Sequence, residues 1–541
     1  MKHLPIYRKK RIALILLLGL FCFVTVFAVR PRKKSNEKIV LKHADRWSYD
    51  QFRQPDAQFL NGNVVLLHSG MTMSCDSAIL FQATNSFEAF GHVKILQGDT
   101  LSLKGELLFY DGGAQLAQMR KNVVMKHRSQ TLLTDSLNYD RLYGIGYFFA
   151  GGELIDAKNR LTSDWGEYDT KTRKAKFNYS VKLKNPQFML TSDTLHYDVI
   201  SKWAEVQGPS NIISGNNHIY TERGYYNTTT EQVRLYDRPV LFNQGSRLVG
   251  DTLLYNKHTG VITTRHNISY EDKKNKIRMT GDYGQYNELT EEALATGKAL
   301  AMNYANGKDT LYVHADTLRL YSYNMKTDSV YRVLHGSPHV RAFRIDVQAV
   351  CDSLVYDTKR KQILLYKDPI VWSDQKQIVG EEINAFMNDS IIDSIYVRRQ
   401  ALLIEKVDST HYNQVAGLLM RSYFDEQGQV RESSVDGNGT LIYFPLEKDS
   451  TILYQVYSEA TNLRSYFIQK QMNKLLGFPS PVGTVYPLAL APMEKTFLPS
   501  FAWFDYIRPL NKDDLFEWRS KKQGSEMKPL LRREAPLQNV K

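Results

Sequence analysis

The sequence predicts an all-β fold, a long stack of short strands built from repeats of about 29 residues. Three observations support this prediction. A short acidic phrase recurs at a nearly constant interval, a valine-rich alternating run follows each copy, and turn-forming residues separate the two. The chain of 541 residues also contains 33 Tyr and 24 Phe, a composition that favours strands.

The repeated phrase reads acidic–x–Leu/Gly–x–Tyr–Asp/Asn, as in "DSLNYD" from Asp135 and "DTLHYD" from Asp193. Most steps between neighbouring copies are 29 residues, and the longest is 36. Such a period over eleven units indicates a repeat architecture. The acidic position falls at Asp76, Glu106, Asp135, Asp164, Asp193, Glu222, Asp251, Asp282, Asp316, Asp352 and Glu381.

Each unit has two halves, and both suit short strands with one apolar and one polar face. The second half is an alternating run such as "AFGHVKIL" or "MRKNVVMKH". We expect the repeats over residues 55–380 and a divergent continuation over 381–478. Within the continuation, Thr461 to Gly477 could form an amphipathic helix when read alone, but its parallel with earlier segments favours strands. Residues 479–541 are expected to form a Pro-rich link, an aromatic segment that caps the stack and a polar tail.

The N-terminus indicates export. Basic residues precede 18 apolar or near-apolar residues at 12–29, and "RPRKK" follows. Residues 1–30 are therefore predicted to be a transmembrane or signal helix, either a signal anchor or a cleaved signal peptide, with an inner-membrane anchor favoured. Residues 31–54 would be a polar connector, and the rest of the chain would lie outside the cytoplasm.

The net charge of +13 suggests an anionic partner, and no nucleic-acid-binding motif accompanies it. Cys75 and Cys351 occupy the same place in the repeat, too far apart along a stack for a disulfide, and are expected to be small buried residues. No metal-type Cys or His spacing, phosphate-binding loop or nucleophile motif is present, so no catalytic residue, metal site or cofactor is predicted.

An acidic residue that recurs eleven times, eight times as Asp and three times as Glu, is not expected to be a catalytic group. We expect Asp135 and its counterparts to set a turn or bulge by accepting hydrogen bonds from backbone N–H groups, with repeated calcium binding as the alternative. The Leu and Tyr of the phrase would form apolar stripes that either pack as a core or line a lipid groove. The groove candidates are Leu137, Tyr139, Leu195, Tyr197, Leu253, Tyr255, Leu354 and Tyr356.

The "DSLxYD/DTLxYD" phrase, the paired "GxV" run and the terminal "F-x-W…RP…F-x-W" pattern from Phe501 to Trp518 resemble the OstA-like proteins of the Bacteroidota. These contain domains of the lipopolysaccharide transport protein A (LptA) type, also called organic solvent tolerance A. The resemblance covers most of the chain after the export segment. It implies a β-jellyroll, a V-shaped stack of antiparallel strands with an apolar groove, and a role in carrying lipopolysaccharide. The chain is longer than a single domain of this type.

The predicted function is therefore that of a non-enzymatic periplasmic protein that binds the lipid A part of lipopolysaccharide. It would form part of a bridge or chaperone between the inner and outer membranes, with residues 12–29 as the favoured anchor. Its partners would be other jellyroll proteins, joined by edge-to-edge β-pairing, and the membrane, but no nucleic acid. Two alternatives remain: a structural or adhesive β-solenoid with a closed core, and a carbohydrate-active β-helix enzyme.

Overall fold

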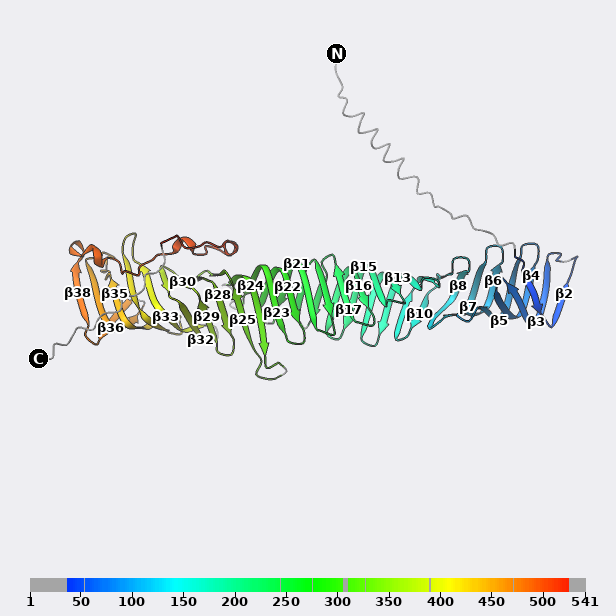
Figure 1. The fold of residues 1–541 in the computed structure, drawn as a ribbon, viewed down its shortest axis with the longest axis horizontal. Coiled ribbons are helices and arrows are strands. Elements are labelled where there is room, and N and C mark those ends of the chain that lie inside the picture. The colour runs from blue at the N-terminus through cyan, green and yellow to red at the C-terminus, as the bar shows by residue number, and fades with distance from the viewer. Residues whose placement is uncertain are drawn as a thin grey trace, which may run out of the picture. The chain divides into compact units, whose positions relative to one another are not determined.

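The computed structural model describes residues 37–52, 54–243, 245–274, 276–304, 310–325, 327–388, 391–469 and 471–524. These residues form 38 strands and four short 3-10 helices, with no α-helix among them, so the predicted all-β fold is confirmed (Figure 1). The predicted N-terminal helix at 1–30 lies outside the described residues. No helix in the described part of the chain is long and apolar enough to cross a membrane.

The chain divides into two compact units. The first comprises Met1–Ala157 and Thr162–Ala175, and the second comprises Lys158–Leu161 and Lys176–Lys541. The chain changes unit between Ala157 and Lys158, and again within the strands β11 (Asn159–Ser163) and β13 (Lys174–Asn185). The other strands of the first unit are β1 (Val40–His43), β2 (Arg46–Tyr49), β3 (Ala57–His68), β4 (Met71–Phe81), β5 (Ser86–Gln97), β6 (Leu101–Asp111), β7 (Leu116–His127), β8 (Gln130–Asp140), β9 (Ile145–Phe148), β10 (Gly152–Asp156) and β12 (Trp165–Asp169).

The second unit contains the remaining strands and all four 3-10 helices. Its strands are β14 (Phe188–Asp198), β15 (Trp203–Ser214), β16 (Asn217–Asn227), β17 (Gln232–Tyr236), β18 (Val240–Asn243), β19 (Ser246–Val249), β20 (Thr252–Asn256), β21 (Val261–Asp272), β22 (Ile277–Asn287), β23 (Glu292–Asn303), β24 (Leu311–Tyr323), β25 (Tyr331–Ser337), β26 (Val340–Arg344), β27 (Val347–Cys351), β28 (Ser353–Asp357), β29 (Gln362–Tyr366), β30 (Ile370–Ser373), β31 (Lys376–Val379), β32 (Glu382–Asn388), β33 (Ile391–Lys406), β34 (Tyr412–Phe424), β35 (Val430–Tyr443), β36 (Tyr454–Ile468), β37 (Gln471–Phe478) and β38 (Val482–Pro487). Its helices are η1 (Leu488–Leu490), η2 (Met493–Lys495), η3 (Asp505–Ile507) and η4 (Asp513–Phe516).

Eighteen of the 38 described strands have 11 or more residues and are longer than the short strands predicted, because they bend and continue instead of ending at the acidic residue. In β7, Lys121 and Asn122 both adopt positive φ angles, of 61° and 50°, and the register with β8 shifts there. The backbone N–H of Asn122 donates to Oδ1 of Asp135 over 3.1 Å. Asp135 therefore sets a bulge, as predicted, and the bulge bends the strand.

The same bend recurs with other polar pairs. Asn63 donates to Asp45 over 3.0 Å, and His92 contacts Asp76 at 2.8 Å, each beside a glycine of positive φ, Gly62 or Gly91. A Cβ added to Gly91 would lie 2.3 Å from a carboxylate oxygen of Asp76, so both the backbone angle and the close approach require glycine. The repeated acidic residue is thus an architectural element of the bend.

Between Tyr331 and Asn388 the bends interrupt the strands fully, and two separate half-sheets result. Strands β25, β28, β29 and β32 pair in one series, which we call the first half-sheet. Strands β26, β27, β30 and β31 pair in another, the second half-sheet. Side chains of both half-sheets, such as Leu354 and Ala349, belong to one buried apolar cluster. The two half-sheets therefore enclose a common interior.

Several segments differ from their sequence-based description. Thr461 to Gly477 contributes to β36 and β37, so the preference for strands over a helix is confirmed. The expected polar connector contains the short strands β1 and β2, and the expected Pro-rich link contains β38. Polar and Pro-containing segments can pair at a sheet edge without an apolar pattern, which is why these strands were not predicted. Cys75 and Cys351 are free and buried, and burial raises the thiol pKa of Cys75 to about 11 and of Cys351 to about 12.

Candidate functional site

The interior of the first unit is closed by hydrogen bonds between opposite strand ends. Because the strands bend, the Tyr of the repeated phrase reaches a polar side chain at the other end of an earlier strand. The hydroxyl of Tyr110 lies 2.6 Å from Nδ1 of His68, and the hydroxyl of Tyr168 lies 2.8 Å from Nδ1 of His127. Tyr139 donates to Oε1 of Gln97 over 3.2 Å. We call these three pairs the Tyr latches.

The Tyr latches are buried from solvent. Both rings of the Tyr110–His68 pair are at most 2 % exposed. Burial raises the pKa of Tyr168 to about 12 and lowers the pKa of His68 and of His127 below the ordinary value of 6.5. Nearby Arg128 and Arg173 lower the pKa of His127 further. Neutral imidazole rings are therefore the form that the closed interior accommodates.

Acidification is expected to weaken the first unit through the latch histidines. A histidine in the unfolded chain takes up a proton near pH 6.5, whereas buried His68 and His127 resist protonation until a lower pH. Their contribution to stability is therefore complete above pH 6.5 and is lost as the pH falls through their lowered folded-state pKa values. Urea unfolding at pH 7.5 and 5.0 would measure the loss, which should be smaller in the double variant His68→Gln/His127→Gln. An equal loss in both proteins would contradict this role.

The second unit begins with a closed interior and then becomes more exposed. Tyr197 accepts a 3.0 Å hydrogen bond from Nδ2 of Asn159 and is 1 % exposed. Along the same cross-strand row, Tyr255 is half-buried and donates to Glu288 over 2.7 Å. Tyr286, next but one in the row, is 36 % exposed. The interior side chains are therefore fully covered near Tyr197 and partly accessible from about Tyr255 onward.

From Met279 to Leu475 the interior carries sixteen partly buried apolar side chains packed against one continuous core cluster. We call this set the apolar stripe. Leu334, Tyr356, Ile363 and Ala385 are successive cross-strand neighbours on the first half-sheet. The stripe comprises Met279, Ala301, Leu311, Leu334, Tyr356, Ile363, Val371, Ile378, Ala385, Ile392, Leu403, Val415, Phe424, Tyr443, Met472 and Leu475.

A second row runs along the opposite side of the stripe. Val371 pairs with Ile378 between β30 and β31 of the second half-sheet, Ile378 pairs with Leu403 of β33, and Leu403 pairs with Val415 of β34. Directly opposed Cβ atoms on neighbouring strands lie about 4.5–5.5 Å apart, so each row forms an unbroken apolar line. The two rows border a common interior that is long, uniform and incompletely covered.

The eight candidate groove residues separate into two groups. Leu137, Tyr139, Leu195 and Tyr197 are at most 2 % exposed and lie in the closed interior. In the second group, Tyr356 belongs to the apolar stripe, Leu354 belongs to its core cluster at 6 % exposed, and half-buried Tyr255 lies beside 1 % exposed Leu253. The structure thus places only the later copies of the phrase beside accessible apolar surface.

The sequence interpretation missed the residues that hold the C-terminal segment in place. Residues 488–524, which we call the strap, lie along the strands of the second unit (Figure 1, orange to red). Buried Gln377 donates to the carbonyl of Ala502 and accepts from the N–H of Phe504, each over 2.7 Å. In the same way, the Gln414 amide donates to the carbonyl of Thr496 over 3.0 Å and accepts from the N–H of Leu498 over 2.8 Å. Uninterrupted apolar runs such as "ALLI" and "PIVW", in place of alternation, were the available signal of cover on both faces.

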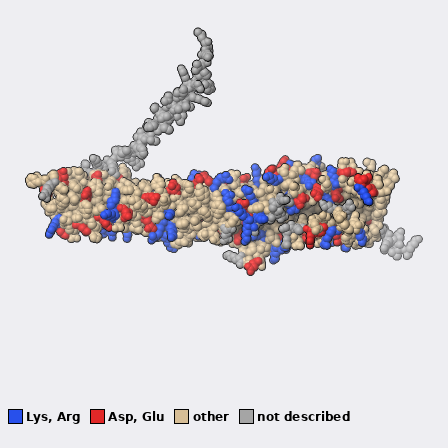
Figure 2. Space-filling model, turned by 180° about the vertical axis from the view of Figure 1, so that it is seen from behind, with Lys and Arg blue, Asp and Glu red and all other residues tan. Residues whose placement is uncertain are grey.

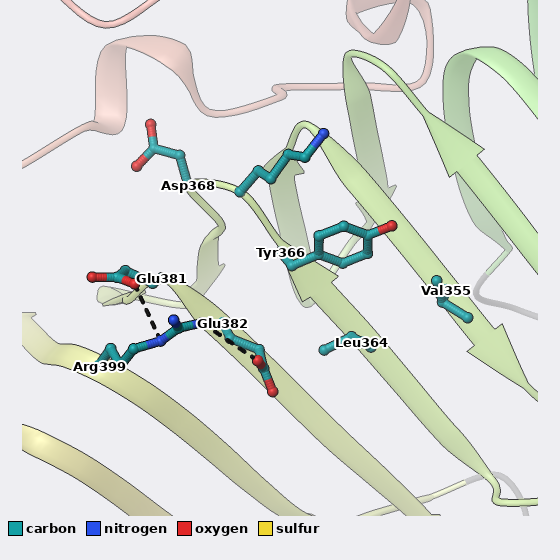
Figure 3. A pocket seen from close by; sticks show the side chains of 8 residues that line it. Val355, Leu364, Tyr366, Asp368, Glu381, Glu382 and Arg399 are labelled. Carbon is teal, nitrogen blue, oxygen red and sulfur yellow. Dashed lines mark ion pairs between the residues drawn. The ribbon is translucent and has the colours of Figure 1, made fainter.

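A surface pocket of about 490 Å³ lies apart from the stripe (Figure 3). Its apolar floor is Val355 and Leu364, a cross-strand pair whose chain neighbours Tyr356 and Ile363 point inward to the stripe. At its rim Arg399 pairs with Glu381 at 3.2 Å and with Glu382 at 3.8 Å. Lys367 and Asp368 of the lining pair with Asp352 and Lys521, so the charged groups of the pocket are paired.

No group of three or more His, Cys, Asp or Glu side chains in the described ranges is placed to hold a metal ion. On the face that Figure 2 shows, Lys and Arg are interspersed with Asp and Glu. Exposed ion pairs of this kind contribute only about 0–1 kcal/mol each, so the net charge of +13 acts mainly by attracting anions over a distance.

These features define a class of protein: an all-β repeat protein whose bent strands surround an apolar interior, closed in one part and partly accessible in another. The model of the family described as OstA-like protein matches residues 36–193 and 189–251. Over these residues the chain is similar to the OstA-like family, so the predicted resemblance is confirmed there; its restriction to the Bacteroidota stays a prediction. Comparison with curated proteins gave no match.

The match relates the chain to β-structure proteins of lipopolysaccharide or other lipid transport. The family is a transport family, not an enzymatic one, and its members are in general periplasmic. The non-enzymatic character of the family is consistent with the prediction that the chain has no catalytic residue.

Proposed function

We propose that the chain binds the acyl chains of lipid A in its apolar stripe and carries lipopolysaccharide across the periplasm. It acts as part of a bridge or as a chaperone between the inner and outer membranes. The observation that carries this proposal is the stripe itself, which has sixteen partly buried apolar side chains, eight of them in two continuous rows. The chain that carries it is similar over residues 36–251 to a lipid-transport family. Apolar surface left accessible over such a length needs an occupant.

The uniformity of the stripe suits transport better than storage. Transfer of a buried CH₂ group from water contributes about 0.8 kcal/mol, but the lipid begins and ends in a membrane, where it already has that stabilisation. A carrier must therefore resemble a bilayer and vary little along its length. Rows of Leu, Ile, Val, Ala and Tyr at every strand meet both conditions, and the lipid can advance without leaving a deep energy minimum.

The exposed sheet edges are proposed docking sites for other jellyroll proteins. In the first unit, β2 pairs only with β3 among the described strands, and it presents Trp47, which is 57 % exposed. In the second unit, β38 pairs with β36 and presents Val485, which is 61 % exposed. Edge-to-edge pairing at such strands would extend the apolar interior into a neighbour. Residues 12–29 are the proposed membrane anchor.

The closed interior of the first unit favours a second role for that part of the chain. The Tyr latches and the full burial of Leu137 are the features expected of a structural β-solenoid with a dry core. The first unit would then serve as a rigid spacer, and lipid binding would belong to the second unit.

Photo-crosslinking tests the proposed function. A photoreactive amino acid at Tyr356 is expected to crosslink to lipopolysaccharide at least about tenfold more than one at Val355, the adjacent residue of β28 that faces the surface pocket. A tenfold preference corresponds to about 1.4 kcal/mol, less than the transfer of two CH₂ groups from water. Equal yields at the two positions, with a known carrier crosslinking normally alongside, would overturn the proposal.

A further inference from the structure

The strap covers the outer face of the second half-sheet and of the adjoining parts of β33 and β34, whose inner face carries the second row of the apolar stripe. In β27, Ala349 and Cys351 belong to the interior cluster, whereas Val350 between them belongs to a separate cluster with Phe504 and Ile507 of the strap. The alternation continues in neighbouring strands. Leu403 lies in the stripe, whereas Leu402 and Ile404 pack with Leu498 of the strap. Since successive side chains of a strand point to opposite faces, these strands are apolar on both sides.

The strap is held through its backbone at successive strands. Gln455 of β36 donates to the carbonyl of Lys495 over 2.6 Å, and Gln414 of β34 and Gln377 of β31 each bind two backbone groups further along. Arg508 of the strap then donates to Gln348 of β27 over 2.7 Å. These four glutamines are at most 3 % exposed. A buried amide that both donates to and accepts from an extended segment imitates the pairing of another strand.

The strap and the stripe cover nearly the same strands. The strap extends from Gln455 on β36 to His314 on β24, where the ring of Phe516 lies 5.0 Å from the imidazole. The stripe extends from Met279 on β22 to Leu475 on β37. Where the second half-sheet carries its row of the stripe on the inner face, its outer face is therefore covered by the strap.

This arrangement has a physical consequence for the second half-sheet. A sheet whose two faces are both accessible to water buries too little apolar surface to hold its position. The strap supplies burial on the outer face, through Trp372, Ile370 and Val379, so the inner face does not need to close against the first half-sheet. Without the strap, the favourable rearrangement would be inward, and it would cover the stripe.

We propose that the strap holds the second half-sheet in the position that keeps the apolar stripe accessible to lipid, and that Gln377 and Gln414 are its positioning residues. This inference rests on the proposed function. It assigns the C-terminal aromatic segment a role in controlling the width of the lipid-binding interior, in place of the end cap expected from its sequence.

The test is to remove and restore the strap in the folded full-length chain. A protease recognition site placed after Ala491, between η1 and η2, allows the strap to be cut from a folded protein that carries the photoreactive amino acid at Tyr356. Removal is expected to lower the lipopolysaccharide crosslink at least about threefold, because binding falls in proportion to the fraction of open molecules. Adding a synthetic peptide of residues 492–524 should restore the crosslink. Unchanged or increased crosslinking after removal would overturn the inference.

Point variants test the same inference without cleavage. The double variant Gln377→Leu/Gln414→Leu should lose crosslinking at Tyr356 and gain proteolytic sensitivity within the strap. The matched control is Gln375→Leu, which changes an exposed glutamine in the turn before β31 and should alter neither. A loose strap with normal crosslinking would contradict the positioning role. If the uncut wild-type chain does not crosslink at Tyr356, the proposed function fails instead.

Discussion

Replacing Asp514 by alanine is expected to release the C-terminal end of the strap. Asp514 lies 3.3 Å from Nη2 of Arg341, whose side chain is completely buried, and it also pairs with Arg519. Nε and Nη1 of Arg341 have no protein partner, so Asp514 is the one carboxylate paired with this guanidinium in the described part of the chain. Breaking a buried ion pair from one side costs about 3–5 kcal/mol, because the remaining charge stays uncompensated.

The strap can avoid that cost by detaching locally, so the expected result is loss of order and not global unfolding. Burial already lowers the pKa of the Arg341 guanidinium, which Asp514 counteracts. Hydrogen exchange of residues 508–519 should accelerate strongly in Asp514→Ala and remain normal in Asp513→Ala, which removes the neighbouring exposed carboxylate of η4. Slow exchange in both variants would show that the aromatic contacts of Phe516 and Trp518 hold the strap end without the ion pair.

The repeat and the β-class could be predicted from the sequence because the information is local. The phrase around Asp135 gives both its own strand and the bulge in the preceding one, since the carboxylate contacts an N–H only 13 residues away. The alternating runs likewise report which face of each strand is buried. A period repeated eleven times averages out the ambiguity of any single copy.

The difference between Tyr139 and Tyr356 could not be predicted, because the two residues occupy the same position of the same phrase. The hydroxyl of Tyr139 is hydrogen-bonded to Gln97, which lies 42 positions earlier in the chain. Whether these two residues meet depends on how strongly the strands bend. Tyr356 is half-buried and lies in the apolar stripe. An apolar pattern identifies an inward face but does not say whether the opposite half-sheet covers it.

The contacts of the strap also could not be predicted from local sequence patterns. Gln377 and Ala502 are 125 residues apart, and a buried glutamine has no distinctive neighbourhood in the sequence. The apolar character of "PIVW" and "ALLI" was visible, but such a run is equally consistent with a strand buried between two sheets. Only the position of the strap distinguishes the two, and that position results from the sum of many weak contacts.

The second large effect is a loss of stability expected for Leu195→Ala. This variant tests whether Leu195 serves in core packing or in contact with lipid. Leu195 is 0 % exposed in the closed interior of the second unit, so its truncation should lower the free energy of unfolding by about 2–5 kcal/mol. The loss combines the transfer of the removed methyl groups with the cavity left behind. In a stack where each strand contacts mainly its neighbours, faster hydrogen exchange should centre on β14 and β15.

His196→Ala is the matched control, because the adjacent side chain points to the opposite face and its imidazole is 38 % exposed. This variant should change stability by less than about 0.5 kcal/mol. Lipopolysaccharide crosslinking at Tyr356 should be normal in both variants, since a distant cavity does not alter the stripe. A stable Leu195→Ala protein with reduced crosslinking would reverse the assignment: Leu195 would then line a lipid path, and the closed interior near Tyr197 would have to open for lipid to pass.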